Sequence, residues 1–166
     1  LSPKGCSFLY VKKDIQEMIK PLVISWGWES DSPGESPFLD HNQWQGTNDI
    51  SPYLITPFVI DFLKNNNWKK VAKRCKKTNL QSRDKVLELF DEKVLCRNAE
   101  SWLGQMSSII LPDCNVLQLY KYLKSKNIEV PTLEWNDMQI LRFSIQAYNN
   151  EEDISRLIKY LKIFFN

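Results

Sequence analysis

The spacing of apolar residues predicts helices in the middle and at the end of the chain. A broad apolar face predicts a helix over residues 82–97, and a clear apolar stripe predicts a last helix that begins near Asn149. Asn149 with Glu152 three residues on resembles a capping box. Shorter helical segments are expected at four further places: 14–20, 49–64, 68–77 and 116–123. Asp49 or Ser51 can cap the second of these.

Short runs of β-branched and aromatic residues predict strands in both halves, at 7–11, 22–26, 106–111, 128–130 and 140–145. Residues 29–48 are rich in Ser, Pro, Asp, Gly and Asn and predict a long loop, which in a compact protein is usually functional or disordered. The second half is expected to be α+β, with a small mixed sheet covered by helices. The first part has too few elements for a core of its own. We therefore expect residues 1–64 to be the tail of a larger domain and residues 65–166 to be a small C-terminal domain.

Composition excludes several classes of protein. Of 166 residues, 43% are hydrophobic and 25% charged, which is ordinary for a globular protein, and the net charge of +2 gives no electrostatic case for nucleic acid or a membrane surface. No apolar run approaches the roughly 20 residues of a membrane span. Four scattered cysteines and a single histidine, His41, predict reduced thiols of a cytoplasmic protein and no metal site. The first residue is not Met, so we expect a fragment.

Three stretches of sequence, in this order and at suitable separations, carry a family resemblance. They are residues 3–11 with 19–27, residues 44–49 with 53–63, and residues 128–131 with Trp135, 141–149 and 152–154. Each is similar to a segment of the isopenicillin N epimerase-like branch of the class V aminotransferases, which are pyridoxal-phosphate (PLP) enzymes. Together the stretches cover nearly the whole chain.

The resemblance implies the C-terminal part of a fold-type I PLP-dependent transferase, of class α/β, that acts on an amino-acid substrate. It implies that residues 1–64 are the tail of the large cofactor-binding domain. It also implies a homodimer in which the PLP site is shared across the interface. The reaction would be that of an epimerase, a lyase or an aminotransferase. In this family the lysine that holds PLP precedes the turn that Lys4 occupies here. We therefore expect that lysine upstream of Leu1, no catalytic residue in this chain, and no activity from the chain alone.

Gly46 and Thr47 resemble the family's Gly-Thr element, which binds the phosphate of the neighbouring subunit's PLP. The residue types suit this role, because glycine lets the backbone approach an oxyanion and a threonine hydroxyl can donate to it. The alternative is an ordinary turn before a capped helix. Trp44 and Gln45 border this element, and Trp44 could contact the substrate or simply pack.

Arg142 is the second candidate. Alternation over 140–146 places Leu141 and Phe143 on one face of a strand and Arg142 on the other. An arginine in an apolar strand calls for an anion, and a substrate α-carboxylate matches its guanidinium. The position resembles the family's carboxylate-binding arginine. The alternative is a structural ion pair with a protein carboxylate.

Two other functions were weighed. A cysteine desulfurase or cysteine lyase of the same superfamily remains an alternative, although the Arg-x-Gly-His-His-Cys type motif of group II desulfurases is absent. A non-catalytic α+β binding module is the other, suggested by six cations at Lys69, Lys70, Lys73, Arg74, Lys76 and Lys77. On a helix, Val71 and Cys75 would form a buried edge and the lysines a solvated face. We therefore expect no nucleic-acid partner.

Overall fold

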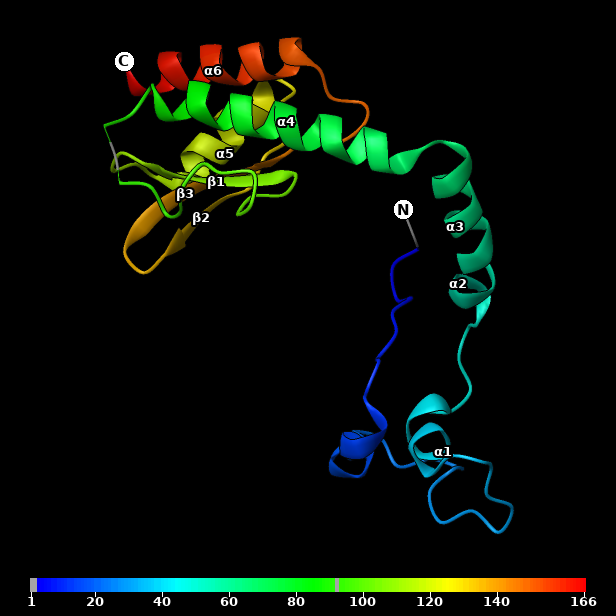
Figure 1. The fold of residues 1–166 in the computed structure, drawn as a ribbon. Helices are drawn as coiled ribbons and strands as arrows, with labels where there is room; N and C mark the ends of the chain where they lie inside the picture. The colour runs from blue at the N-terminus through cyan, green and yellow to red at the C-terminus, as the bar shows by residue number, and fades with distance from the viewer. Residues whose placement is uncertain (1–2, 92) are drawn as a thin grey trace. The chain divides into compact units, whose positions relative to one another are not determined.

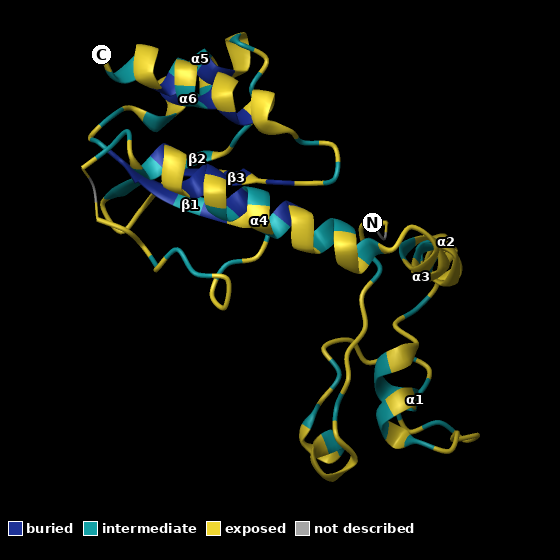
Figure 2. Ribbon diagram, turned by 45° about the horizontal axis from the view of Figure 1, so that its top comes forward, coloured by how far each residue is buried: buried dark blue, intermediate teal, exposed yellow. Residues whose placement is uncertain are grey.

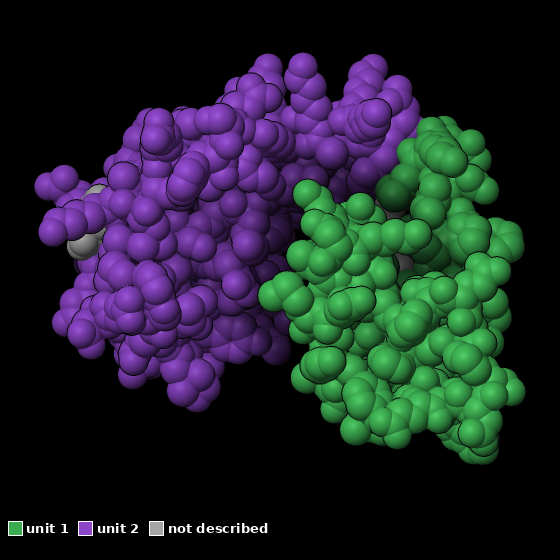
Figure 3. All heavy atoms as spheres, turned by 60° about the horizontal axis from the view of Figure 1, so that its bottom comes forward, with its two compact units in different colours: residues 1–66 green, residues 67–166 purple. Residues whose placement is uncertain are grey.

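The structure is a computed structural model that describes residues 3–91 and 93–166. The chain divides into two compact units, Leu1–Asn66 and Asn67–Asn166, which Figure 3 colours separately. The assignment of the first to a large cofactor-binding domain and of the second to a small C-terminal domain stays a prediction.

The first unit consists of short helices joined by irregular chain (Figure 1): η1, a 3-10 helix, at Lys13–Met18, α1 at Pro37–Gln43, α2 at Ser51–Leu54 and α3 at Thr56–Asn65. Each α-helix has a proline in its first turn, where the missing N–H costs nothing. The side chain of Ser36 caps α1 by accepting a hydrogen bond from the Leu39 N–H. None of the described residues of this unit is buried (Figure 2), so these residues form no hydrophobic core of their own.

Several expectations for this unit were wrong. Residues 7–11 and 22–26 are not strands, and their apolar side chains lie in solvent, Phe8 at 94% exposure and Leu22 at 101%. A strand needs a neighbour to accept its backbone hydrogen bonds, and the described part of this unit provides none. The predicted loop 29–48 contains α1, and the predicted helix 49–64 is interrupted at Ile55.

The second unit is a three-stranded sheet with helices packed on one face (Figure 1): α4 at Trp68–Leu87, β1 at Met106–Leu111, α5 at Val116–Ser125, β2 at Thr132–Trp135, β3 at Met138–Ser144 and α6 at Glu151–Phe165. The strand order is β1-β3-β2, and both pairings are antiparallel. The mixed sheet that the sequence suggested was therefore wrong.

A two-residue turn explains the antiparallel arrangement of β2 and β3. Asn136 and Asp137 both have positive φ, 48° and 59°, as the tight turns of β-hairpins require. Asn and Asp tolerate this conformation better than most residues. The expected strand at 128–130 is not one, because pairing with β3 begins only at Thr132, after Pro131.

One long helix replaces the two expected at 68–77 and 82–97. α4 continues through residues 78–81 and ends at Leu87, so residues 88–91 and 93–97 are not helical. The polar Asn79 lies inside this helix, and its side chain is fully buried and hydrogen-bonded. It donates to the Gly104 carbonyl at 3.1 Å and accepts from the Ser107 hydroxyl at 2.9 Å. A buried polar group with partners is compatible with a helix interior.

The core lies between the helices and one face of the sheet. It contains Leu119 and Leu123 of α5, Leu141 and Phe143 of β3, and Leu161 of α6, all at most 4% exposed. The apolar stripe of the last helix is thus confirmed, as are the strands expected at 106–111 and 140–145 and the helix at 116–123.

The capping box of α6 lies one residue later than expected. Asn150, not Asn149, accepts from the Asp153 N–H, and Asp153 accepts from the Asn150 N–H in return. Across the described residues, no helix is both long and apolar enough to cross a membrane.

Candidate functional site

Gly46 and Thr47 form an open bend between α1 and α2. Gly46 has a φ of +114°, which favours glycine, and a Cβ built there would meet nothing within 4 Å. Thr47 is exposed, and among the described residues neither its hydroxyl nor the two backbone N–H groups of the bend form a hydrogen bond. The bend therefore presents free donors to an incoming anion. This arrangement fits a phosphate.

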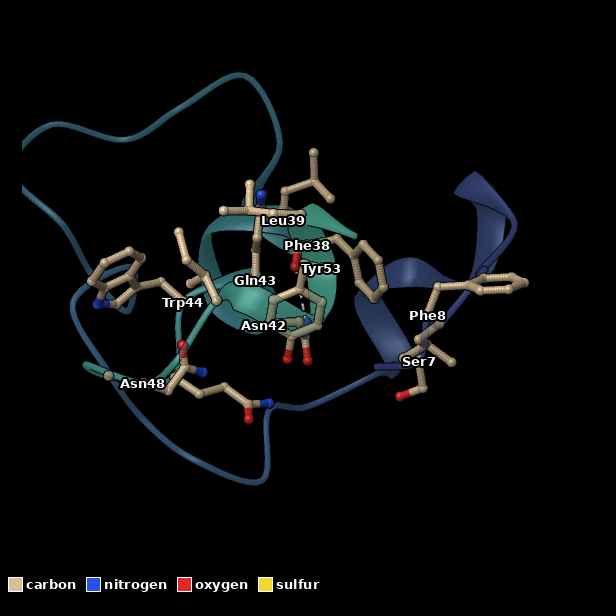
Figure 4. A pocket seen from close by; sticks show the side chains of 14 residues that line it. Ser7, Phe8, Phe38, Leu39, Asn42, Gln43, Trp44, Asn48 and Tyr53 are labelled. Atoms are coloured by element: carbon tan, nitrogen blue, oxygen red, sulfur yellow. Dashed lines mark hydrogen bonds between the residues drawn. The ribbon is translucent and has the colours of Figure 1, made fainter. Parts of the chain in front are cut away.

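A cavity of about 710 Å³ lies beside this bend and includes Gly46 in its lining. Figure 4 shows the rings of Phe38 and Tyr53 at its centre with the Trp44 side chain at its edge. Its lining consists of apolar and aromatic residues, amides and one serine, with no charged side chain. Trp44 is 55% exposed, so it is available for contact and is not a core residue of this unit.

The first unit also contains Lys4, His41 and Trp26. Lys4 is exposed in a turn that Gly5 completes at a φ of +87°. His41, on α1, is half-buried against the Trp28 ring, with the ring centroids 4.6 Å apart. Trp26 is 85% exposed.

Arg142 lies on the outer face of β3, as the alternation predicted. Leu141 and Phe143 are buried in the core, whereas Arg142 and Ser144 are exposed on the opposite face. The Arg142 backbone N–H donates to the Pro131 carbonyl at 2.9 Å, which fixes the strand at this point. Its guanidinium forms no ion pair or hydrogen bond with any described residue. The structural ion pair that was the alternative is not present among these residues.

A second cavity, of about 410 Å³, is lined by Arg142 and by residues that precede β2 and begin α6. Arg156, on α6, is a second cation in this lining. In the sequence Arg156 is one of several polar residues on the exposed face of a helix, and no motif distinguishes it from the others.

The surroundings of Cys114 disfavour its thiolate form. Burial, followed by the charges of Asp113 and Glu134, raises the pKa of the Cys114 thiol, so this cysteine is less reactive than an ordinary one. All four cysteines are free thiols. Within residues 3–91 and 93–166, no group of His, Cys, Asp or Glu side chains could hold a metal ion.

The basic cluster of α4 has the arrangement of a solvated helix face. Cys75 is buried and Val71 half-buried against the core, as expected. Most of the cations are exposed, namely Lys69, Lys70, Lys73, Arg74 and Lys77.

Comparison with known proteins places these residues in a family. The family model for aminotransferase class V matches residues 1–157. The chain belongs to this family. Within the class V aminotransferases it is 27% identical to isopenicillin N epimerase of Amycolatopsis lactamdurans over 98% of this chain and 44% of that protein. It is also 27% identical to isopenicillin N epimerase of Streptomyces clavuligerus over 95% of this chain and 42% of that protein.

The chain therefore spans less than half the length of these curated relatives. Among solved structures, 8-amino-7-oxononanoate synthase from Francisella tularensis is similar with a TM-score of 0.58 at 16% identity, over 78% of this chain and 38% of that one. At this identity the likeness shows a shared fold and nothing of the reaction. Class V aminotransferases are PLP-dependent enzymes, and the mixed α/β architecture fits such a fold.

Proposed function

We propose that the protein to which this chain belongs is a PLP-dependent enzyme of the isopenicillin N epimerase-like branch, acting on an amino acid as a homodimer. In this proposal Arg142 binds the α-carboxylate of the substrate. Gly46 and Thr47 bind the phosphate of the cofactor held by the partner subunit. When bound, PLP supplies an electron-withdrawing ring that stabilises negative charge at the substrate α-carbon. In this proposal the residues of this chain bind and orient the substrate and the cofactor.

The observation that carries the proposal is the free guanidinium of Arg142. A strand that is paired on both sides around this residue holds its backbone, and no described carboxylate neutralises its side chain. Guanidinium groups bind carboxylates through two parallel hydrogen bonds, which fixes orientation as well as position. Such a group can hold a substrate by its carboxylate and leave the α-carbon free to react.

The Gly46–Thr47 bend supports the cofactor part of the proposal. Free N–H and hydroxyl donors at a residue with room for close backbone approach are what a phosphate group requires. The nearby Asp49 carboxylate would repel a phosphate, but its Oδ1 accepts hydrogen bonds from both the N–H and the hydroxyl of Ser51, at 2.9 and 2.6 Å. These bonds hold the Asp49 carboxylate against the first residue of α2, where a negative charge is favourable.

The test of the substrate role uses the full-length enzyme with Arg142→Met and Arg142→Lys. Loss of a bidentate charged contact should lower kcat/KM for the amino-acid substrate by about tenfold to a hundredfold in the methionine variant, and less in the lysine variant. Arg97→Met is the control, since Arg97 is an exposed arginine of the same unit that lines neither cavity. Equal kcat/KM for wild type and Arg142→Met would refute the assignment.

The cofactor role is tested separately by Thr47→Val and Thr47→Ser. We expect PLP affinity, measured by titration of the cofactor's absorbance, to fall by about tenfold in the valine variant and to be largely kept in the serine variant, because only serine retains the hydroxyl. A full-length protein that does not bind PLP at all would refute the proposed enzyme class. When the full-length protein does bind PLP, product analysis with an amino acid of known configuration distinguishes the epimerase, lyase and aminotransferase reactions.

A further inference from the structure

The cavity at Arg142 contains a second arginine on a different element. Arg142 comes from β3 and Arg156 from the second turn of α6, and both line the same cavity of about 410 Å³. The cavity lies wholly within the second unit. Two cations in one small cavity favour a ligand that carries two anionic groups.

The lining of this cavity also has two acidic residues, Glu129 and Asp153. Asp153 Oδ2 accepts from the Asn149 side chain and from the Asn150 N–H, both at 3.1 Å, as part of the cap of α6. The charge of Glu129 acts on Lys124, where it helps to raise the pKa of the amine after the larger effects of Tyr120. Neither acid forms an ion pair with Arg142 or Arg156 among the described residues.

The Arg156 side chain is held in place by one of its own hydrogen bonds. Its Nη2 donates to the Lys126 carbonyl at 2.7 Å, which ties α6 to the end of α5. The rest of the guanidinium forms no hydrogen bond with a described residue, so donors remain for a ligand. A guanidinium already fixed at one corner loses less conformational freedom when it binds a carboxylate than a free side chain does.

We propose that Arg156 binds a second acidic group of the substrate, so that the enzyme acts on an amino acid whose side chain carries a carboxylate. This inference rests on the proposed binding of the α-carboxylate by Arg142. The larger cavity beside Gly46 has no charged lining and offers no competing position for such a group. Selectivity between acidic and neutral amino acids is therefore assigned to α6.

The experiment measures binding of two matched pairs of amino acids to the full-length, PLP-loaded protein by calorimetry: L-glutamate with L-norvaline, and L-aspartate with L-2-aminobutyrate. Wild type should bind at least one acidic member about tenfold more tightly than its neutral counterpart. Arg156→Met should abolish that preference without weakening the neutral ligand, and Arg156→Lys should keep part of it. Because Arg156 is exposed, the preference should also shrink as salt is raised.

Lys159→Met is the matched control, since Lys159 is an exposed cation of α6 outside the cavity, and it should leave the preference unchanged. Absence of any preference in wild type, or its persistence in Arg156→Met, would overturn the inference. Arg142→Met distinguishes this failure from failure of the proposed function, because it should weaken acidic and neutral ligands alike. Should Arg156→Met fold poorly, as judged by its melting temperature, Arg156→Gln replaces it as the uncharged variant, since its amide can still donate to the Lys126 carbonyl.

Discussion

Arg83 of α4 provides the sharpest test of how the second unit is packed. This arginine is 0% exposed, and its Nη2 donates to the Cys96 carbonyl at 2.9 Å. Its Nε and Nη1 are buried and have no hydrogen-bond partner among residues 3–91 and 93–166. Compared with an apolar side chain of the same shape, a buried charge with unpaired donors lowers the free energy of unfolding by roughly several kcal/mol.

Arg83→Met removes the charge and keeps most of the volume. The loss of the hydrogen bond to Cys96 costs about 1–3 kcal/mol, whereas relief of the buried guanidinium offsets several kcal/mol. We therefore expect the free energy of unfolding to be unchanged or to rise by about 1–4 kcal/mol. Arg83→Ala loses the same bond and also leaves a cavity, so it should be roughly 2 kcal/mol or more less stable than Arg83→Met.

Urea denaturation followed by circular dichroism measures both differences in the same buffer. For a unit of about 100 residues, 1 kcal/mol corresponds to a shift of about 4–8 °C in Tm, which a thermal melt would also detect. A loss of more than about 2 kcal/mol in Arg83→Met would refute the reasoning. That result would mean that the guanidinium is stabilised by a buried water or anion, which the contacts among described residues do not include.

Three further predictions concern single contacts. Asn150→Ala should destabilise α6 and the second unit by about 1 kcal/mol, measured by urea denaturation, because it removes the acceptor for two N–H groups of the first turn; an unchanged midpoint would contradict the cap. The two hydrogen bonds from Ser51 lower the pKa of Asp49, so their stabilisation of α2 should be present near neutral pH and lost as pH falls through that lowered pKa; an NMR titration should show the pKa rise part of the way toward its ordinary value in Ser51→Ala, which loses the hydroxyl donor and keeps the backbone N–H, and an unchanged pKa would contradict this. The Cys114 thiol should react with iodoacetamide more slowly at pH 8 than a free cysteine, because burial raises its pKa, and equal rates would contradict this.

The second unit could be anticipated from the sequence where periodicity and burial agree. In β3 strict alternation placed Leu141 and Arg142 on opposite faces, and the structure has them so. The hydrophobic pattern did not predict the structure where a polar side chain of α4 is buried against residues far away in the sequence. The sequence suggested two helices, at 68–77 and 82–97, where α4 is one, and the Asn79 side chain inside α4 bonds to residues 104 and 107. Nothing in the sequence marks Arg83 as buried.

The first unit was predicted less well for a physical reason. The runs that include Phe8 and Leu22 have the composition of strands, but composition does not supply a pairing partner. Without one, the chain between the helices of this unit remains irregular. Each of its three α-helices has a proline in the first turn, and α1 is also capped by the Ser36 side chain. The bend at Gly46 and Thr47 was located by family resemblance, and its openness is a finding of the structure.

The turn at Asn136 and Asp137 has a consequence for ligand selectivity although it lies apart from the second cavity. Its length sets the register of β3 against β2, and a shift of one residue would exchange the two faces of the strand. Arg142 would then enter the hydrocarbon interior and Phe143 would leave it. An insertion or deletion at this hairpin tip would thus remove the proposed carboxylate site as effectively as replacing the arginine itself.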